Sequence, residues 1–362
     1  RIPEKKAGQF QGMRIIGQVF VPGIIGPAIG AAVLKNAEVI VNNDGTTSFL
    51  PNENIFLAAL VVAVILLIIL VAIFTMMKNG HYELMSEAGE RVLKTDSAWN
   101  KYPRPQLKRD NYTILNKGWK LNGSNIRVPF PPQSVLSGYG KKVGKYLEYS
   151  CEFTAETGKR TILHFGAVDE TSEVYLNGQF LGSHEGGYLP FSFDITEALL
   201  TENKLVVKVK DTLSKEYPYG KQTKKRGGMW YTPVSGIWQN VWTEQVPDNY
   251  IEKLYITPDE KSVKVAVKMS DGEAPFVKLK VYLHNGETFE RVCDNSEVFV
   301  DFSEVKTQTG EAYKPQKWSP ETPYIYRTEV TVADDCVETY FALRSIAVKD
   351  VDGVQRVCLN GE

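Results

Sequence analysis

Residues 226–242 read RGGMWYTPVSGIWQNVW and hold the side chains best suited to contact a polar organic ligand. Two glycines precede Met229, Trp230 and Tyr231, so this aromatic segment is expected on an exposed loop. The face of an indole ring can pack on the apolar face of a sugar, and the Arg226 guanidinium can bind hydroxyls or a carboxylate. Packing between domains is the simpler interpretation of the same residues, and sugar contact is the alternative.

Other candidate sites are weaker. The four cysteines form no Cys-x-x-Cys pair, and with four histidines in the chain they predict neither a zinc site nor a disulfide framework. His184 and Glu185 are better explained as turn residues than as a site. A net charge of −1 argues against a nucleic-acid-binding protein, and 43% apolar residues exclude a disordered chain. We therefore expect no metal, no cofactor and no nucleic-acid partner.

Apolar and polar residues alternate with period two in much of the chain after residue 95, which is typical of strands with one solvated face. The pattern is clear at residues 205–210, 263–268 and 277–283. Asn-Gly and Asp-Gly pairs between such runs predict tight hairpins. About 265 residues exceed one ordinary sandwich, so two antiparallel β-sandwiches in tandem are expected, with a boundary at residues 246–248. Two prolines in YPRPQLKRDNY, residues 102–112, exclude a helix there and predict an extended segment that wraps a sandwich.

The N-terminal part has a different character. Residues 55–77 contain one polar side chain and are long enough to cross a bilayer, and the Gly- and Pro-rich residues 15–34 are a second candidate span. A re-entrant or amphipathic segment is the alternative for residues 15–34. Basic residues before the first span and acidic ones between the spans place both ends in the cytoplasm. The expected localisation is membrane-associated, with a lipid bilayer as partner of residues 15–77 and the β-domains cytoplasmic.

Two parts of the sequence resemble known protein families. The first, GQVFVPGIIGPAIGAAVL followed by IFLAALVVAVILLIILVAIF, resembles the last two helices of a major facilitator superfamily sugar or cation symporter, over residues 1–78. The second rests on VYLNG, HEGGYLPF, SGIWQNVW and WSPETPYIY, which occur in this order after residue 95. Together they resemble glycoside hydrolase family 2, the β-galactosidase and β-glucuronidase family.

The second resemblance implies a domain order. The expected order is a linker at residues 79–95, a jelly-roll sugar-binding domain at 96–246, an immunoglobulin-like sandwich at 247–349 and the start of a (β/α)8 barrel at 350–362. The fold class is therefore all-β, preceded by two transmembrane helices. The chain begins with Arg1 and ends at Glu362, so we interpret it as a fragment that lacks the barrel. The family's nucleophile and general acid both lie in that barrel, so no catalytic residue is expected here.

The resemblance also bears on the site. Jelly-roll loops of this family reach over the mouth of the barrel, and Arg226, Met229, Trp230 and Tyr231 are the best match to such a loop. Some relatives have an Asp before the Met-Trp pair that contacts the sugar. Gly228 stands at that place here, which puts this contact in doubt.

Three functions remain open at this point. The first is the non-catalytic N-terminal part of a retaining β-glycosidase, fused to the end of a transporter. The second is a membrane-tethered carbohydrate-binding module without chemistry. The third is a transporter fragment joined to β-domains by gene adjacency. A β-galactoside or β-glucuronide is expected as the carbohydrate, and the sequence does not decide between them.

Overall fold

The computed structural model describes residues 37–42, 44–49, 87–95, 99–213, 216–224 and 229–361, together with Leu34, Leu57, Leu60, Val64 and Ile68. The chain divides into two compact units, Arg1–Tyr82 and Glu83–Glu362. The expected spans at residues 15–34 and 55–77 lie almost wholly outside the described residues. Within the part that is described, no helix combines the length and apolar character needed to cross a membrane.

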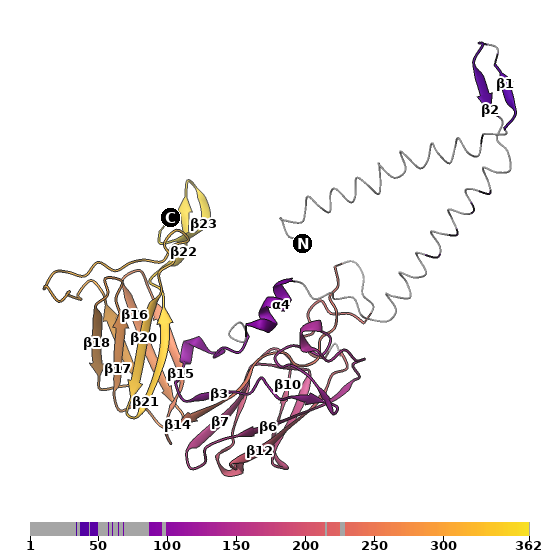
Figure 1. Ribbon diagram of the computed structural model, residues 1–362. Coiled ribbons are helices and arrows are strands. Elements are labelled where there is room, and N and C mark those ends of the chain that lie inside the picture. The colour runs from indigo at the N-terminus through magenta and orange to yellow at the C-terminus, as the bar shows by residue number, and fades with distance from the viewer. Residues whose placement is uncertain are drawn as a thin grey trace. The chain divides into compact units, whose positions relative to one another are not determined.

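The first unit contains one short hairpin in its described residues. Strands β1 (Val39–Val41) and β2 (Thr47–Phe49) pair in antiparallel fashion, Ile40 opposite Ser48 (Figure 1). The Asp44 carboxylate accepts hydrogen bonds from the Thr46 amide and hydroxyl and so closes the turn. The sequence pattern indicated only a polar loop between the two spans, and the short strands were not predicted.

The first described element of the second unit is helix α4 (Glu87–Lys94), inside the expected linker. A 3₁₀ turn, η3 (Pro105–Leu107), follows, so the prediction that two prolines exclude any helix at residues 102–112 was wrong by one turn. Pro105 stands in the first turn, where its missing N–H is not needed. The wrapping itself is confirmed, because Leu107 belongs to the core of the second sandwich and Lys108 pairs with Glu338 there.

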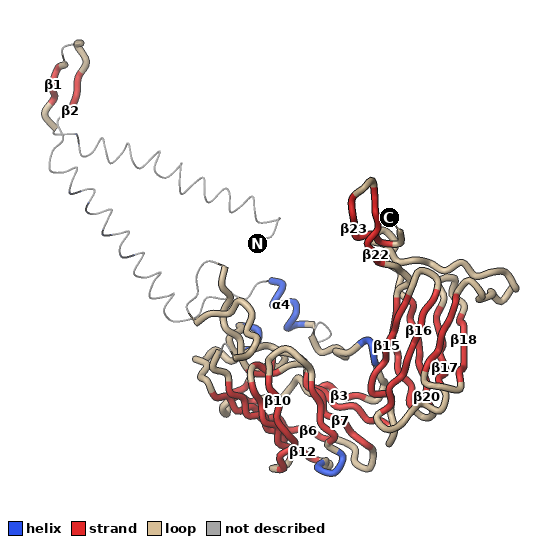
Figure 2. Tube along the Cα trace, turned by 180° about the vertical axis from the view of Figure 1, so that it is seen from behind, coloured by secondary structure: helices blue, strands red, loops and turns tan. Residues whose placement is uncertain are grey.

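In the first sandwich, residues 112–246, a larger sheet packs face to face against a smaller one (Figure 2). In the described residues the larger sheet has the spatial order β10 (Gln179–Glu185), β9 (Thr171–Leu176), β12 (Glu202–Lys210), β6 (Tyr146–Thr154), β4 (Lys120–Leu121) and β5 (Ser124–Asn125). The smaller sheet has the order β11 (Phe191–Asp194), β7 (Arg160–Phe165), β14 (Val241–Val246) and β3 (Tyr112–Ile114). A separate pair joins β8 (Val168–Asp169) to β13 (Gly236–Ile237), and 3₁₀ turns η4 (Val135–Ser137) and η5 (Thr196–Ala198) lie in the connections.

The alternating pattern explains why these strands form a sandwich. On β12, Leu205, Val207 and Val209 are buried, while Lys204 and Lys208 are exposed. The inward residues pack with those of β6, β7 and β9 into one apolar core. The Asn177–Gly178 pair turns β9 into β10, and both residues have positive φ, as such a turn requires. The predicted strand and turn at this place are therefore confirmed.

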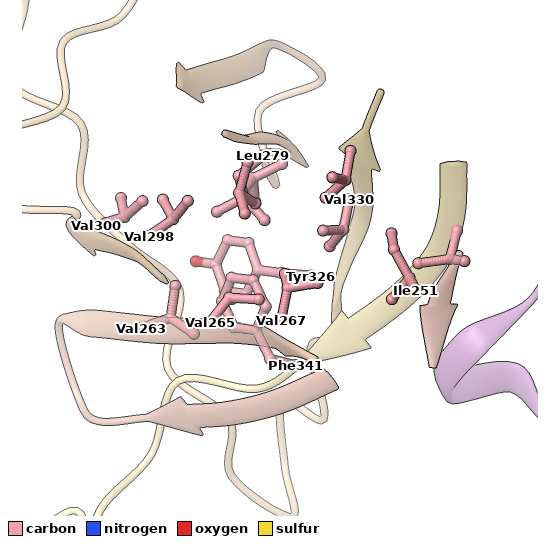
Figure 3. Packing of buried hydrophobic residues seen from close by; sticks show 14 of the residues in the cluster. Ile251, Val263, Val265, Val267, Leu279, Val298, Val300, Tyr326, Val330 and Phe341 are labelled. Atoms are coloured by element: carbon pink, nitrogen blue, oxygen red, sulfur yellow. The ribbon is translucent and has the colours of Figure 1, made fainter. Parts of the chain in front are cut away.

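The second sandwich, residues 251–341, has its own core (Figure 3). One sheet has the order β15 (Ile251–Pro258), β16 (Ser262–Met269) and β19 (Glu297–Asp301). The facing sheet has the order β18 (Thr288–Cys293), β17 (Val277–Tyr282), β20 (Tyr326–Val332) and β21 (Asp335–Phe341). Val263, Val265 and Val267 gather around Tyr326 and Phe341 in the interior, which confirms the predicted inward face of β16. β14 ends at Val246 and β15 begins at Ile251, so the chain passes from the first sandwich to the second between these two residues.

A hairpin of β22 (Ile346–Val351) and β23 (Val354–Leu359) follows the second sandwich. The expected boundary between residues 349 and 350 falls inside β22. Asn360 fixes the base of the hairpin, because its side-chain amide donates to the Trp318 carbonyl (2.9 Å) and its carbonyl oxygen accepts from the Ser345 amide (3.1 Å).

Candidate functional site

A turn of three large exposed side chains stands out on the first sandwich. Met229, Trp230 and Tyr231 are 69%, 52% and 65% exposed. Backbone hydrogen bonds hold the turn at its end, from the Tyr231 amide to the Lys221 carbonyl (2.9 Å) and from the Thr223 amide to the Tyr231 carbonyl (3.2 Å). These bonds pair residues 221–223 with Tyr231 and present the aromatic rings to solvent.

A second loop brings two more exposed apolar residues to the same place. Tyr188 and Leu189 follow Gly186-Gly187 and are 46% and 70% exposed. The Tyr188 hydroxyl lies over Gly220, 3.3 Å from where a Cβ there would be, and Gly220 directly precedes Lys221. The Trp238 indole fixes this loop by donating to the Gly187 carbonyl (2.8 Å), and its ring meets Tyr188 edge to face. We call Tyr188, Leu189, Met229, Trp230 and Tyr231 the aromatic patch.

A buried polar pair lies between the two loops. Gln222, 9% exposed, interacts through its side chain with the carboxylate of Asp169, and its Oε1 accepts a hydrogen bond from the Val234 amide (2.6 Å). The Asp169 side chain lies against Gly187, so close that a Cβ there would be 2.2 Å from Oδ1. Burial, followed by the nearby Asp211, raises the pKa of Asp169 to about 6, against the interaction with Gln222.

Two other buried carboxylates, Glu244 and Asp335, serve the junction of the two sandwiches. Glu244 and Asp335 both bind the buried guanidinium of Arg109. Burial opposes ionisation of Glu244, but His164, Arg104 and hydrogen bonds from Tyr102 and Trp242 hold its pKa below the usual value. A carboxylate fixed in this way is a structural ion-pair member rather than a proton donor. Within the described residues no group of three or more His, Cys, Asp or Glu side chains could hold a metal ion.

Three of the four predicted site residues are thus brought together at the surface. Met229, Trp230 and Tyr231 form the turn, and Arg226 lies outside the described residues. Their exposure leaves both sugar contact and packing against a further domain as predictions. Sequence reasoning missed Tyr188 and Leu189, although Gly186-Gly187-Tyr188-Leu189 repeats the Gly-Gly-apolar-apolar order of residues 227–230. That repeat was the available signal.

Two family models match the chain, one on each sandwich. Residues 142–245 match the galactose-binding domain-like model of glycosyl hydrolase family 2, and residues 249–344 match the model of glycosyl hydrolases family 2. The first match runs from just before β6 nearly to the end of β14 and leaves out β3, β4 and β5, and the second spans β15 to β21. They include Tyr188, Leu189 and the turn of residues 229–231 in the first of the two domains.

Curated relatives point to the same enzymes. A β-galactosidase of Thermoanaerobacter pseudethanolicus is 29% identical over 222 residues, which are 57% of this chain and 28% of the relative. A protein named putative β-glucuronidase from Formosa agariphila is 26% identical over 69% of this chain and 31% of the relative. The chain therefore spans about a third or less of the length of these relatives.

Solved structures agree on the fold. A β-glucuronidase from Ruminococcus gnavus, in complex with C6-substituted uronic isofagomine, superposes with a TM-score of 0.53 at 18% identity. The superposition covers 71% of this chain and 49% of that one. A Lactobacillus rhamnosus β-glucuronidase gives a TM-score of 0.54 at 20% identity, over 70% and 48% of the two chains. The two sandwiches of this chain therefore match, in order, the galactose-binding-like jelly-roll domain and the immunoglobulin-like domain of glycosyl hydrolase family 2.

Proposed function

We propose that this chain is the non-catalytic, sugar-contacting part of a retaining β-glycosidase of the β-galactosidase or β-glucuronidase type. The aromatic patch carries this proposal. It exposes five large apolar side chains on neighbouring loops of a galactose-binding-like domain. Rings of this kind suit the apolar face of a sugar, while isolated exposed apolar residues need no explanation.

The division of labour follows from what retaining glycosidases need. Such an enzyme uses one carboxyl group as acid and base and a second as nucleophile, about 5 to 5.5 Å apart on either side of the scissile bond. The buried carboxylates Glu244 and Asp335 are neutralised by Arg109, and Asp169 lies beneath the patch. We infer that the catalytic pair belongs to a further domain and that the patch contributes to the substrate site beside it.

Sugar binding with a matched control tests the proposal. Binding of methyl β-galactoside and methyl β-glucuronide to the full chain is followed by saturation-transfer NMR at millimolar sugar. Trp230→Ala is expected to weaken binding by about 2- to 10-fold, the value of one aromatic contact. Tyr255→Ala removes an aromatic side chain of similar exposure (49%) from the second sandwich and should leave binding unchanged. Equal effects of the two variants, or none from Trp230→Ala, would contradict a site at the patch.

A turnover assay tests the second part of the proposal, that this chain does not catalyse hydrolysis by itself. The chain is expected to give no turnover of chromogenic β-galactosides, β-glucuronides or β-mannosides above a heat-killed control. Loss of one catalytic acid or base removes a factor of about 10² to 10⁴, and neither group is expected here. Measurable turnover would show that a carboxylate pair in the sandwiches acts on its own.

We also propose that residues 15–34 and 55–77 tether these domains to a membrane, with the domains on the cytoplasmic side. The apolar run at residues 55–77 and the basic residues before residue 15 support this. The transporter-like origin of this segment, by natural fusion or by gene adjacency, rests on the sequence resemblance alone. Protease protection in sealed vesicles is the test, and digestion of the sandwiches from the non-cytoplasmic side would contradict it.

A further inference from the structure

Asp169 touches both loops of the aromatic patch. It ends strand β8 and pairs with Gly236 of β13, which fixes its main chain at the rim of the first sandwich. Its side chain is directed against Gly187 in the loop that carries Tyr188. The same carboxylate interacts with the side chain of Gln222, which is paired with Tyr231 in the other loop.

Gln222 extends this contact across the second loop. Its side-chain carbonyl accepts from the Val234 amide, so one amide group bridges Asp169 to the segment that follows the exposed turn. The neighbouring Glu170 reinforces the first loop, because its carbonyl accepts from the Gly186 amide (2.8 Å).

We propose that Asp169 is a positioning residue that holds the two loops of the aromatic patch side by side, acting through Gly187 and Gln222. The inference rests on the proposed function, since it concerns how the sugar-contacting surface is held. Asp169 is 7% exposed and does not itself form part of that surface. Its effect on a ligand is therefore indirect, through the placement of Tyr188 and Tyr231.

The surroundings of Asp169 couple this role to pH. Burial and the charges of Asp211 and Glu170 disfavour its ionised form and raise its pKa, and the pKa of Asp211 is raised as well. The charge of Lys224 lowers the pKa of Asp211 and so partly offsets the rise in the pKa of Asp211. Other titratable groups on the elements around Asp169 include His184, Glu185 and Tyr217. Tyr188 and Lys221 of the two loops and Tyr149 against Gly236 belong to them as well. An opened loop would expose Asp169 to water and restore its usual pKa, so protonation favours the closed arrangement and ionisation loosens it.

Hydrogen exchange of single amides in the full chain tests the proposal. The reporters are the Tyr231 amide, bonded to Lys221, and the Val234 amide, bonded to Gln222. In the wild type their protection is expected to fall by about tenfold from pH 5 to pH 8, after correction for intrinsic exchange. Asp169→Asn keeps an acceptor for Gln222 but cannot ionise, so its protection should stay high and flat over the same range.

Two further variants and a control complete the design. Asp169→Ala and Gln222→Leu remove one end of the bridge and should lower Val234 protection by about tenfold at every pH. Asp301→Asn makes the same charge change in the second sandwich, where Asp301 accepts from Ser303, and should leave both reporters as in the wild type. If Asp169→Ala fails to fold, the pH series of the wild type and of Asp169→Asn still decides.

The outcomes separate this inference from the proposed function. Identical pH profiles in the wild type and Asp169→Asn, or unchanged protection in Gln222→Leu, would overturn the positioning role. These readouts need no sugar, so they hold even if the patch binds none. Failure of sugar binding with the expected exchange pattern would instead count against the proposed function alone.

Discussion

The Arg109 guanidinium meets the Asp335 carboxylate at two points, Nε to Oδ1 at 3.0 Å and Nη2 to Oδ2 at 2.7 Å. Arg109 stands just before the first strand of the first sandwich, and Asp335 begins β21 of the second. Nη1 also binds Glu244 of β14 at 3.0 Å, and the Ile251 amide donates to Asp335 Oδ2 at 2.7 Å. One buried cation thus joins β14, β15 and β21 at the junction.

Removing the Arg109 guanidinium should lower the free energy of unfolding strongly. Arg109→Met would leave the Asp335 carboxylate buried without a counter-ion and Glu244 with only the more distant Arg104, at 3.9 Å. Breaking a buried pair in this way typically costs about 3–5 kcal/mol. Urea unfolding of the full chain measures the loss. Arg327→Met breaks a solvent-exposed pair with Glu338 and should change stability by less than about 1 kcal/mol. Equal effects of the two substitutions would show that the junction does not depend on Arg109.

His164 should make the first sandwich sensitive to acid. Burial, with help from Arg104 and Arg109 and against Glu244, lowers the pKa of His164 to about 4. Its ring stacks on Trp242, and its Nε2 has no hydrogen-bond partner among the described residues. Because the folded state binds the proton less tightly than the unfolded state, stability is lost as pH falls from about 6.5 to 4, by at most about 3 kcal/mol.

His164→Phe should remove that loss while keeping the stacked ring. The free energy of unfolding of the variant, measured at intervals between pH 7 and pH 4.5, is expected to fall less steeply than that of the wild type. His284 lies in the second sandwich and makes a hydrogen bond to Tyr313, so His284→Phe serves as a control for loss of an imidazole. Parallel pH curves for the wild type and His164→Phe would rule out titration of His164 as the cause.

Asp169 should lower stability at neutral pH. Its pKa is raised to about 6 in the folded protein, so the folded state prefers the protonated form. The penalty is present above about pH 6 and disappears as pH falls toward the unfolded value. Asp169→Asn is therefore expected to gain about 1–2 kcal/mol at pH 7.5, after allowance for residual solvent screening, and the gain should shrink by pH 4.5. A gain that is the same at both values would exclude titration as its source.

Gly187 is expected to tolerate no side chain. A Cβ there would lie 2.2 Å from Asp169 Oδ1, so Gly187→Ala must displace the carboxyl group or the loop that carries Tyr188. The expected loss of stability is about 1–3 kcal/mol, the usual range for overpacking, together with weaker sugar binding. Gly144→Ala is the matched control, because a Cβ there would meet its nearest neighbour at 4.0 Å. Unchanged stability and binding in Gly187→Ala would mean that this contact is not tight.

Much of the fold was predictable because one face of each strand is buried. The valines of β16 and the apolar residues of β12 alternate with lysines, and that pattern shows which face is inward. The junction was not predictable. Arg109 lies in a segment whose sequence predicts only an extended chain that wraps a sandwich. Its partners Glu244 and Asp335 are 135 and 226 residues away. No local pattern links charges that meet only after two sandwiches have formed.

The site was predictable in part for a similar reason. Two glycines and an aromatic pair marked the turn of residues 229–231 as exposed, and its side chains are exposed. Tyr188 joins them through the pairing of a distant loop, which a single sequence does not specify. Asp169 reads as an ordinary strand-end residue, and its buried contact with Gly187 depends on the close approach of two backbones.

Photo-labelling of the patch tests the central claim most directly. The full chain is irradiated with diazirine-bearing β-galactoside and β-glucuronide probes, with and without excess unlabelled sugar, and the labelled peptides are sequenced by mass spectrometry. We predict that competed label concentrates in residues 186–191 and 229–234, and that Trp230→Ala reduces it in both. Competed label on the outer face of the second sandwich, at Tyr255 and Phe299, or label that excess sugar does not suppress, would contradict a sugar site at the aromatic patch.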